Sequence, residues 1–281
     1  QMTNAFFQLT EKSVALLCLP ASYIAGKMML VRAFAGNFSI LAVQPSANPF
    51  SEVKDSAAAF DFVAITPYQL FHSANDLSRC SIKNCIVGGS PVTAAMEEQV
   101  RDWPIAMYET FGMTETASHI AVRRFNGNAA TDAFEVLNGV SISLDERGCL
   151  EIYAPHLHAD KLITNDLVEI RDERHFHWLG RYDRVVNSGG VKIFPEQIER
   201  KMMDLIDLPF FIASVPHPAL GQQLVLILEA ENLPEPVREV ILEALRSRLD
   251  KYEIPGKIIC IASFVYSSSN KLLRNETMAK I

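Results

Sequence analysis

The chain has 281 residues, of which 49% are hydrophobic and 21% are charged, and its formal net charge at pH 7 is −7. This is the balance of a globular protein with a sizeable core, and the length suffices for one large domain or two ordinary ones. The acidic charge and the lack of a long basic run argue against nucleic acid or an anionic membrane surface as a partner, because both reward clustered lysine and arginine.

The cysteines and the apolar runs bear on the cellular compartment. Only Cys80 and Cys85, of five cysteines, lie near each other, and their spacing matches no zinc or redox motif. We therefore expect reduced, mostly packed thiols in a cytoplasmic protein. The longest apolar runs, at 14–19 and 224–228, are much shorter than a membrane span, and no signal peptide is visible, so we expect no membrane insertion.

Residues 14–107 alternate short apolar runs with helical stretches. The predicted strands cover 14–19, 38–43, 62–65, 85–87 and 105–108, and the predicted helices cover 23–34, 52–60, 67–74 and 91–101. Pro91 lies in the first turn of the last helix, where proline is tolerated. This alternation, with strands that are apolar on both faces, predicts a mainly parallel sheet covered by helices.

The pattern changes after Glu115. Short strands joined by turns are predicted over 119–123, 134–136, 140–144, 150–153, 167–171 and 175–179, and they favour an antiparallel meander or a small barrel. From Gly180 the predicted elements are helices over 195–205 and 235–251, strands over 210–215, 224–228 and 257–264, and a helix after Asn270. We predict an N-terminal domain at 1–182, with an α/β part at 1–117 and a β-rich part at 118–182, and a small α+β domain at 183–281.

Gly88, Gly89 and Ser90 lie between a predicted strand and the next helix. Glycine lets a planar ligand or a phosphate approach the backbone, and the start of a helix favours negative charge. Two glycines before a helix are more often an ordinary loop, so this segment alone indicates only a candidate nucleotide site.

Residues 108–116 follow a predicted strand end, where open α/β sheets place their ligands. They combine an aromatic ring at Phe111, a flexible glycine at Gly112, a hydroxyl at Thr114 and a carboxylate at Glu115. These groups suit stacking on a base, close approach to a phosphate, a phosphate hydrogen bond and a Mg²⁺ ligand. The alternative is a polar loop with one buried phenylalanine.

Three later segments add polar groups. Asp166 can accept hydrogen bonds from both hydroxyls of a ribose and Arg181 can donate to the same sugar, although an aspartate in a turn is usually only a cap. Gly189 and Gly190 precede a strand and form a loop able to approach a ligand. Lys271 ends a polar loop near the C-terminus. A lone lysine is usually a solvated surface charge, and Lys271 is a candidate site residue only because the other four segments are present.

Taken in order, these five segments resemble the motifs of the acyl/aryl-CoA synthetases of the adenylate-forming superfamily, over residues 14–274. Within that superfamily, residues 17–20, 23–27 and 112–118 look most like the o-succinylbenzoate–CoA ligases of menaquinone biosynthesis. The resemblance implies a large N-terminal domain, a small mobile C-terminal domain, and ligation of an aromatic dicarboxylic acid to coenzyme A through an acyl-adenylate. It implies ATP, Mg²⁺ and coenzyme A as ligands, with no tightly bound prosthetic group, and it leaves a homodimer open.

The resemblance also assigns roles to matching residues. Nucleotide contacts fall on Gly88, Gly89, Ser90, Phe111, Gly112, Met113, Thr114, Asp166, Arg181 and Lys271. Phe111 would stack on the adenine, Thr114 would contact the α-phosphate, and Glu115 would hold Mg²⁺. Lys271 would bridge the attacking carboxylate and the α-phosphate, where negative charge accumulates. Thr114, Glu115 and Lys271 form the expected catalytic set.

The same resemblance implies two poses of the small domain. After adenylation this domain would swing about a hinge at Asp183, which would remove Lys271 and bring Gly189 and Gly190 toward the acyl-adenylate. Lys192 would then meet a phosphate of coenzyme A; an ordinary surface lysine is an equal alternative.

Arg32 stands among apolar residues of the helix predicted at 23–34, an unfavourable place for a cation without a partner. Our interpretation is that Arg32 holds the aromatic carboxylate of the acid while the succinyl carboxylate is activated. Gly26, Thr116 and Ser118 are assigned to the same acid site. The alternative is a guanidinium that reaches solvent along its aliphatic stem.

Two features depart from the family pattern. The phosphate loop that ends in Gly-Lys is expected upstream of the helical stretch at 2–9, and because the chain opens with Gln1 directly into that stretch, we expect its N-terminal part to be missing. Asn270 stands where the family usually has glycine. The alternatives are therefore another acyl- or aryl-CoA synthetase, or a degenerate, non-catalytic nucleotide-binding protein without the phosphate loop.

Overall fold

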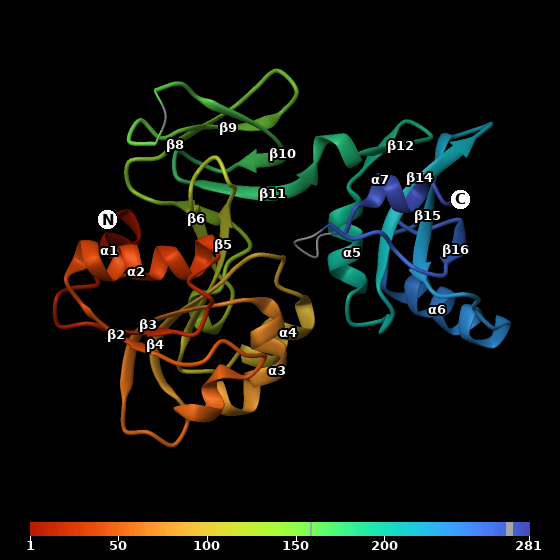
Figure 1. Cartoon of the computed structure of the whole chain (residues 1–281). Helices are drawn as coiled ribbons and strands as arrows, with labels where there is room; N and C mark the ends of the chain where they lie inside the picture. Colours follow the sequence, from red (N-terminus) through yellow and green to blue (C-terminus); the bar gives the residue numbers. More distant parts are fainter. Residues whose placement is uncertain (158, 268–271) are drawn as a thin grey trace. The chain divides into compact units, whose positions relative to one another are not determined.

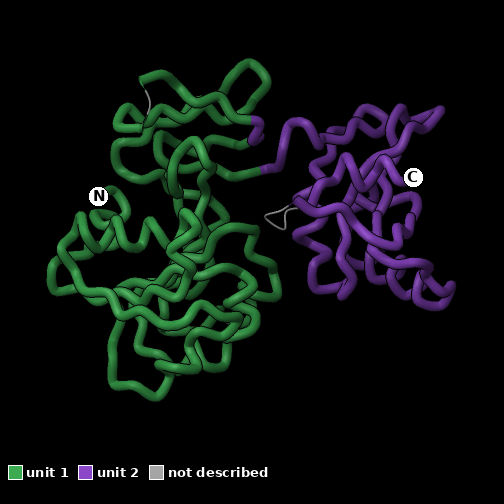
Figure 2. The backbone as a smooth tube through the Cα atoms, viewed as in Figure 1, with its two compact units in different colours: residues 1–164, 168–178 green, residues 165–167, 179–281 purple. Residues whose placement is uncertain are grey.

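The computed structural model describes residues 1–157, 159–267 and 272–281. They form two compact units: unit 1 comprises 1–164 and 168–178, and unit 2 comprises 165–167 and 179–281 (Figure 2). The domain boundary predicted between residues 182 and 183 falls inside unit 2, near its beginning at residue 179. The assignment of domains to that boundary stays a prediction.

Five parallel strands alternate with helices in the first part of unit 1. The strands are β1 Val14–Leu17, β2 Ser39–Ala42, β3 Ala59–Ile65, β4 Ser81–Val87 and β5 Ala106–Gly112. The helices are α1 Met2–Phe6, α2 Ile24–Gly36, α3 Pro67–Leu77 and α4 Ala94–Val100. The pairs among these strands that define the order β2-β1-β3-β4-β5 are all parallel, as predicted.

Helices cover both faces of this parallel region. Along β3, Phe62 packs in the core beneath α1 and α2, whereas its neighbour Val63 packs in the core beneath α3 and α4. Figure 1 shows the two pairs of helices on opposite sides of the strands. Burial on both faces explains why these strands read as nearly continuous apolar runs.

The remaining strands extend the same sheet. They are β6 His119–Arg124, β7 Phe134–Val136, β8 Ser141–Leu144, β9 Cys149–Tyr153, β10 Leu162–Ile170 and β11 His175–Arg181. The full order is β2-β1-β3-β4-β5-β6-β7-β11-β10-β9-β8, with antiparallel pairing of β5 to β6, β6 to β7, β7 to β11 and β8 to β9. Antiparallel pairing agrees with the prediction, but over the described residues the strands continue one open sheet and form no separate barrel.

Unit 2 is a small α+β unit, as predicted. Its strands are β12 Val186–Ser188, β13 Val191–Ile193, β14 Phe210–His217, β15 Gly221–Glu229 and β16 Lys257–Ile261, and its helices are α5 Pro195–Met202, α6 Glu235–Arg248 and α7 Arg274–Met278. The sheet order is β13-β12-β15-β14, with β16 parallel to β15. Leu226 of β15 packs with Ile198 of α5 and Leu245 of α6, whereas Val225 packs with Phe211 on the other face.

The helix predicted over 52–60 is wrong. A 3-10 turn at Pro49–Glu52 is followed by irregular turns, and β3 already begins at Ala59. Phe50 and Val53 are buried three residues apart, which is the spacing of one 3-10 turn. Beyond Val53, the sequence Lys-Asp-Ser-Ala-Ala offers no large apolar side chain that could hold a helix on the core.

The helix predicted over 91–101 begins three residues later, at Ala94. Val92 is fully buried in extended chain, and Thr93 caps the helix by accepting a hydrogen bond from the backbone N–H of Met96 (3.1 Å). Thr93, and not Pro91, therefore sets the first turn.

Two predicted ligand loops are partly strand. β5 continues through Gly112, and β10 begins at Leu162, five residues earlier than expected. Phe111 and Asp166 consequently project from strands, so backbone pairing fixes their positions more firmly than a loop would.

All five cysteines are free, and four of them are buried, as predicted. Among the described residues, no helix combines the length and the apolar character that crossing a membrane requires.

Candidate functional site

The loop after β4 needs its two glycines for different reasons. A Cβ atom on Gly88 would lie 2.2 Å from Oγ1 of Thr110, so any side chain there would collide with β5. Gly89 has φ of +101°, a conformation that strongly favours glycine. Ser90 is exposed at the tip. The predicted nucleotide loop is thus pressed against β5 next to Phe111.

Phe111 belongs to an aromatic cluster at the end of β5. Its ring centroid lies 5.7 Å from that of Phe134 and 5.2 Å from that of Phe176, the second contact being edge-to-face. The ring remains partly exposed. One side of Phe111 is therefore supported by the core, which suits a platform on which a planar ligand stacks.

A tight turn follows β5 and presents Thr114 and Glu115 to solvent. Thr116 is 2% exposed, and its Oγ1 accepts from the N–H of Met113 (2.9 Å) and donates to the carbonyl oxygen of Met113 (2.9 Å) or of Ser118 (2.7 Å). The Thr116 hydroxyl is thus used to form the turn, and its predicted contact with the acid stays a prediction.

Arg32 of α2 is 4% exposed, so the alternative in which its guanidinium reaches solvent is wrong. Nη2 donates to Oγ of Ser118 at 2.7 Å, Nη1 faces Sδ of Met29 at 3.9 Å, and Nε is buried without a hydrogen-bond partner among the described residues. Burial lowers the pKa of Arg32 to about 10, and within the described parts of the chain no carboxylate opposes that effect. Among the described residues, no carboxylate contacts this buried cation.

His119 adjoins this cation and supplies no negative charge. Its Nδ1 lies 3.5 Å from Nη2 of Arg32, and its Nε2 lies 3.2 Å from Oγ1 of Thr3. Burial, and then the charge of Arg32, lower the pKa of His119 to about 3, so the imidazole is neutral near pH 7.

Gly26, assigned to the acid site, lies on the same helix as Arg32. A Cβ atom there would lie 2.3 Å from the carbonyl oxygen of Pro20. The glycine therefore lets the start of α2 pack closely on the loop after β1.

The predicted ribose residues lie together in unit 2. Asp166 of β10 is 6% exposed, and its Oδ2 lies 3.6 Å from Nη1 of Arg181. Nε of Arg181 also donates to Oδ1 of the predicted hinge residue, Asp183, at 3.4 Å. One guanidinium therefore contacts both aspartates.

Gly189 and Gly190 form a two-residue hairpin turn between β12 and β13. Both have positive φ, +57° and +85°, and Ser188 pairs with Val191 on either side of the turn. Lys192 is exposed on β13. Asn270 and Lys271 lie outside the described residues; on their two sides, Tyr266 and Leu272 form an antiparallel bridge.

The structure therefore gathers the predicted residues in two sets. In unit 1, the Gly88 loop contacts β5, and Arg32 contacts Ser118 beyond the end of β5. In unit 2, Asp166, Arg181 and Asp183 form one group, and the glycine hairpin forms another.

Sequence reasoning missed a second buried arginine, Arg123 of β6, and its partner Glu109 of β5. Nε and Nη2 of Arg123 donate to Oε2 of Glu109 at 3.0 and 2.6 Å. The available signal was Glu109 inside one apolar strand and Arg123 near the end of the next, because an unpaired charge is costly when buried.

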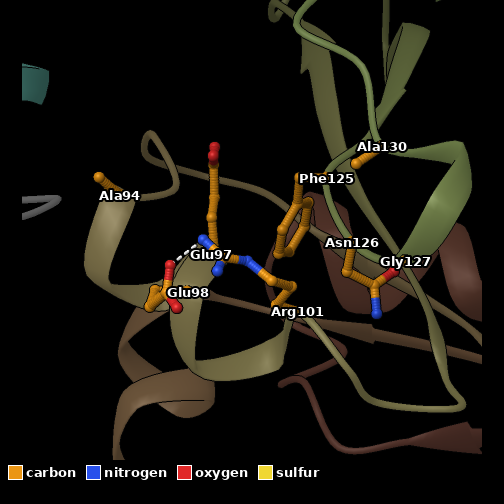
Figure 3. Close-up of a pocket in the computed structure, with 8 residues that line it drawn as sticks. All are labelled: Ala94, Glu97, Glu98, Arg101, Phe125, Asn126, Gly127 and Ala130. Carbon is orange, nitrogen blue, oxygen red and sulfur yellow. Dashed lines mark hydrogen bonds and ion pairs between the residues drawn. The ribbon is translucent and has the colours of Figure 1, made fainter.

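A cavity of about 390 Å³ lies where α4 meets the chain after β6 (Figure 3). Its lining consists of Ala94, Glu97, Glu98, Arg101, Phe125, Asn126, Gly127 and Ala130. The Asn126 amide is already engaged: Oδ1 accepts from the N–H of Met107, and Nδ2 donates to the carbonyl oxygen of Ile105. The predicted site residues are not part of this lining, so the cavity is separate from the candidate site.

Known proteins place this fold in a clear group, although no protein-family model matches the sequence. The o-succinylbenzoate CoA synthetase of Bacillus subtilis, solved in complex with the acyl-adenylate intermediate OSB-AMP, has a TM-score of 0.81 and 21% identity, covering 98% of this chain and 62% of that chain. This confirms the predicted adenylate-forming fold. The curated 2-succinylbenzoate–CoA ligase of the same organism is 23% identical over 95% of this chain, and this chain spans 61% of the length of that relative.

A more similar sequence carries the assignment to a family. A crystal structure of an acyl-CoA synthetase (AMP-forming)/AMP-acid ligase II-like protein from Dyadobacter fermentans has a TM-score of 0.62 and covers 99% of this chain. Because its sequence is 36% identical and this chain covers 81% of it, the chain belongs to the family of AMP-forming acyl-CoA synthetases and AMP-acid ligases.

Proposed function

We propose that the chain belongs to an ATP-dependent ligase that joins 2-succinylbenzoate to coenzyme A through an acyl-adenylate. Two lines support this acid: the names of the curated relatives, and the buried cation of unit 1. Residues 183–281 are proposed as the mobile C-terminal domain, and a homodimer is retained as the proposed assembly.

The acid site rests on Arg32, the single observation that carries the proposal. Burying a guanidinium without a counter-charge is costly, and a substrate carboxylate removes that cost on binding. The free Nε and the remaining N–H groups of Arg32 match a carboxylate, which accepts two parallel hydrogen bonds. A dicarboxylic acid can satisfy Arg32 with one carboxylate and present the other for activation.

The nucleotide contacts are proposed residue by residue within each unit. Gly88, Gly89 and Ser90 border the adenine, and Phe111 stacks on it with its exposed side. Gly112 and Met113 continue this border, and Thr114 donates to the α-phosphate. In unit 2, Asp166 accepts from the ribose hydroxyls and Arg181 donates to the same sugar.

Glu115 is proposed as the Mg²⁺ ligand. Among the described residues, no three histidine, cysteine or acidic side chains gather as a metal site. One exposed carboxylate fits Mg²⁺, which commonly takes one or two protein carboxylates and completes its shell with phosphates and water. When bound, the ion neutralises charge on the phosphates.

The proposed reaction has two steps. A succinyl carboxylate oxygen attacks the α-phosphorus and pyrophosphate leaves, with Lys271 neutralising charge at phosphorus. The small domain then turns about Asp183, the thiol of coenzyme A attacks the acyl carbon, and AMP leaves. Gly189 and Gly190 approach the acyl-adenylate in the second pose, and Lys192 meets a phosphate of coenzyme A.

Release of AMP tests the function. The protein is incubated with ATP, Mg²⁺, coenzyme A and either 2-succinylbenzoate, benzoate or a fatty acid. We expect AMP release with 2-succinylbenzoate, and we expect Lys271→Ala to abolish it while sparing thioester formation from supplied 2-succinylbenzoyl-adenylate. Turnover with benzoate or fatty acids, but none with 2-succinylbenzoate, would favour another acyl-CoA synthetase; no nucleotide-dependent reaction in either step would favour a non-catalytic nucleotide-binding protein.

A further inference from the structure

The loop after β4 is held by two consecutive residues of β5. Oγ1 of Thr110 donates to the carbonyl oxygen of Val87 at 3.3 Å, and Gly88 packs directly against that hydroxyl. Four residues further along the loop, the N–H of Val92 donates to Oε1 of Glu109 at 3.0 Å. The segment 88–92 therefore has its beginning and its end attached to the strand that carries Phe111.

Oε1 of Glu109 can accept a hydrogen bond from the N–H of Val92 because Arg123 binds the other carboxylate oxygen, Oε2. The Glu109 side chain is almost completely buried, directly opposite Arg123 in the antiparallel register of β5 and β6. Arg123 donates twice to Oε2 of Glu109 and so leaves Oε1 for the loop. A buried carboxylate without this cation would tend to take up a proton or leave the core.

Arg123 also reaches α4 and the aromatic cluster. Its Nη2 donates to Oε1 of Glu97 at 2.7 Å, and its guanidinium lies over the ring of Phe134 at 5.9 Å from the centroid. Phe134 in turn packs against Phe111. A single buried cation therefore supports the loop, the helix that follows it and the neighbour of the aromatic platform.

We infer that Glu109 and Arg123 are positioning residues of the nucleotide site, and that their ion pair holds segment 88–92 and Phe111 in the arrangement that receives the adenine. The inference rests on the proposed function, because it assumes that this loop and this ring border the adenine. A site whose supporting groups are fixed before binding loses less conformational freedom when the ligand arrives.

AMP affinity, measured by calorimetry, tests the inference at a temperature where each variant is folded. Glu109→Ala leaves the Val92 N–H without an acceptor, and we expect about tenfold weaker AMP binding. Glu109→Gln keeps one acceptor oxygen but turns its amide NH2 toward either Arg123 or the Val92 N–H, both of which are donors, so we expect an affinity between those of the unmodified protein and Glu109→Ala. Glu98→Gln is the control for the glutamate-to-glutamine change, because Glu98 lies at the surface of α4 and pairs with Arg101 (Figure 3); it should not change AMP binding.

The outcomes separate the inference from the function on which it rests. A folded Glu109→Ala variant that binds AMP as tightly as the unmodified protein would mean that the ion pair only stabilises the fold. An unmodified protein that does not bind AMP would overturn the nucleotide site itself.

If Glu109→Ala does not fold, hydrogen exchange of the Val92 amide in the unmodified protein tests whether Glu109 holds the loop. In the unmodified protein, the Val92 amide should exchange as slowly as the amides of β5, because it donates to a buried carboxylate. Exchange of the Val92 amide at the rate of an exposed loop amide would contradict its hydrogen bond to Glu109 and with it the inference.

Discussion

Arg123 of β6 and Arg32 of α2 are both buried, at 2% and 4% exposed, in very different surroundings. Arg123 meets the carboxylates of Glu109 and Glu97, whereas Arg32 meets a hydroxyl, a thioether and a neutral imidazole. Burial lowers the pKa of both side chains, but the charges of Glu109 and Glu97 outweigh burial and raise the pKa of Arg123. The paired arginine completes the fold, and we propose that Arg32, which contacts no carboxylate among the described residues, binds an anion from outside the chain.

Replacing Arg123 should have the largest effect on stability. Arg123→Met removes the cation but leaves Glu109 buried, and breaking a buried pair in this way typically costs about 3–5 kcal/mol. Urea unfolding followed by circular dichroism measures the loss of unfolding free energy.

The matched control is the same substitution at the other arginine. Arg32→Met strands no carboxylate, so we expect the unfolding free energy to stay within about 1 kcal/mol of the original or to rise. Equal losses at the two positions would remove the distinction between the paired and the unpaired cation.

The pH dependence of stability should show the contribution of His119. Its pKa is lowered to about 3 in the folded protein, so between pH 6.5 and 3 the unfolded chain binds the proton more readily. The stability that a neutral His119 contributes is complete above pH 6.5 and falls as the pH drops toward 3, by up to about 1.4 kcal/mol per pH unit.

His119→Gln should flatten this part of the pH profile. Arg32→Met should flatten it partly, because the charge of Arg32 is the second cause of the lowered pKa. An unchanged profile in His119→Gln would mean that another group titrates in this range.

Much of the fold could be predicted from local pattern. The apolar strands of the parallel region are buried on both faces, so their alternation with helices is visible in the sequence. The five ligand segments are also local, and their order was sufficient to indicate the adenylate-forming fold. The helix predicted at 52–60 is wrong because a few apolar residues around a 3-10 turn resemble the start of a helix.

Contacts between distant residues could not be predicted in this way. Arg32 and Ser118 are 86 residues apart, and their hydrogen bond depends on how α2 packs beside the end of β5. Glu109 and Arg123 face each other only because β5 and β6 pair in one register. The apolar neighbours of Arg32 show in the sequence that its charge is unusual, but only the structure shows that it is buried and that no carboxylate contacts it among the residues described.

The central claim is that Arg32 binds the aromatic carboxylate of the acid, and two ligands test it directly. Affinities of the unmodified protein and of Arg32→Met are measured for 2-succinylbenzoate and for the same acid without its aromatic carboxylate, each in the presence of AMP. We predict that the unmodified protein prefers the dicarboxylate by about tenfold or more and that Arg32→Met loses this preference, because a charge-assisted hydrogen bond contributes about 1.5–3 kcal/mol. A preference that persists undiminished in Arg32→Met would contradict the account.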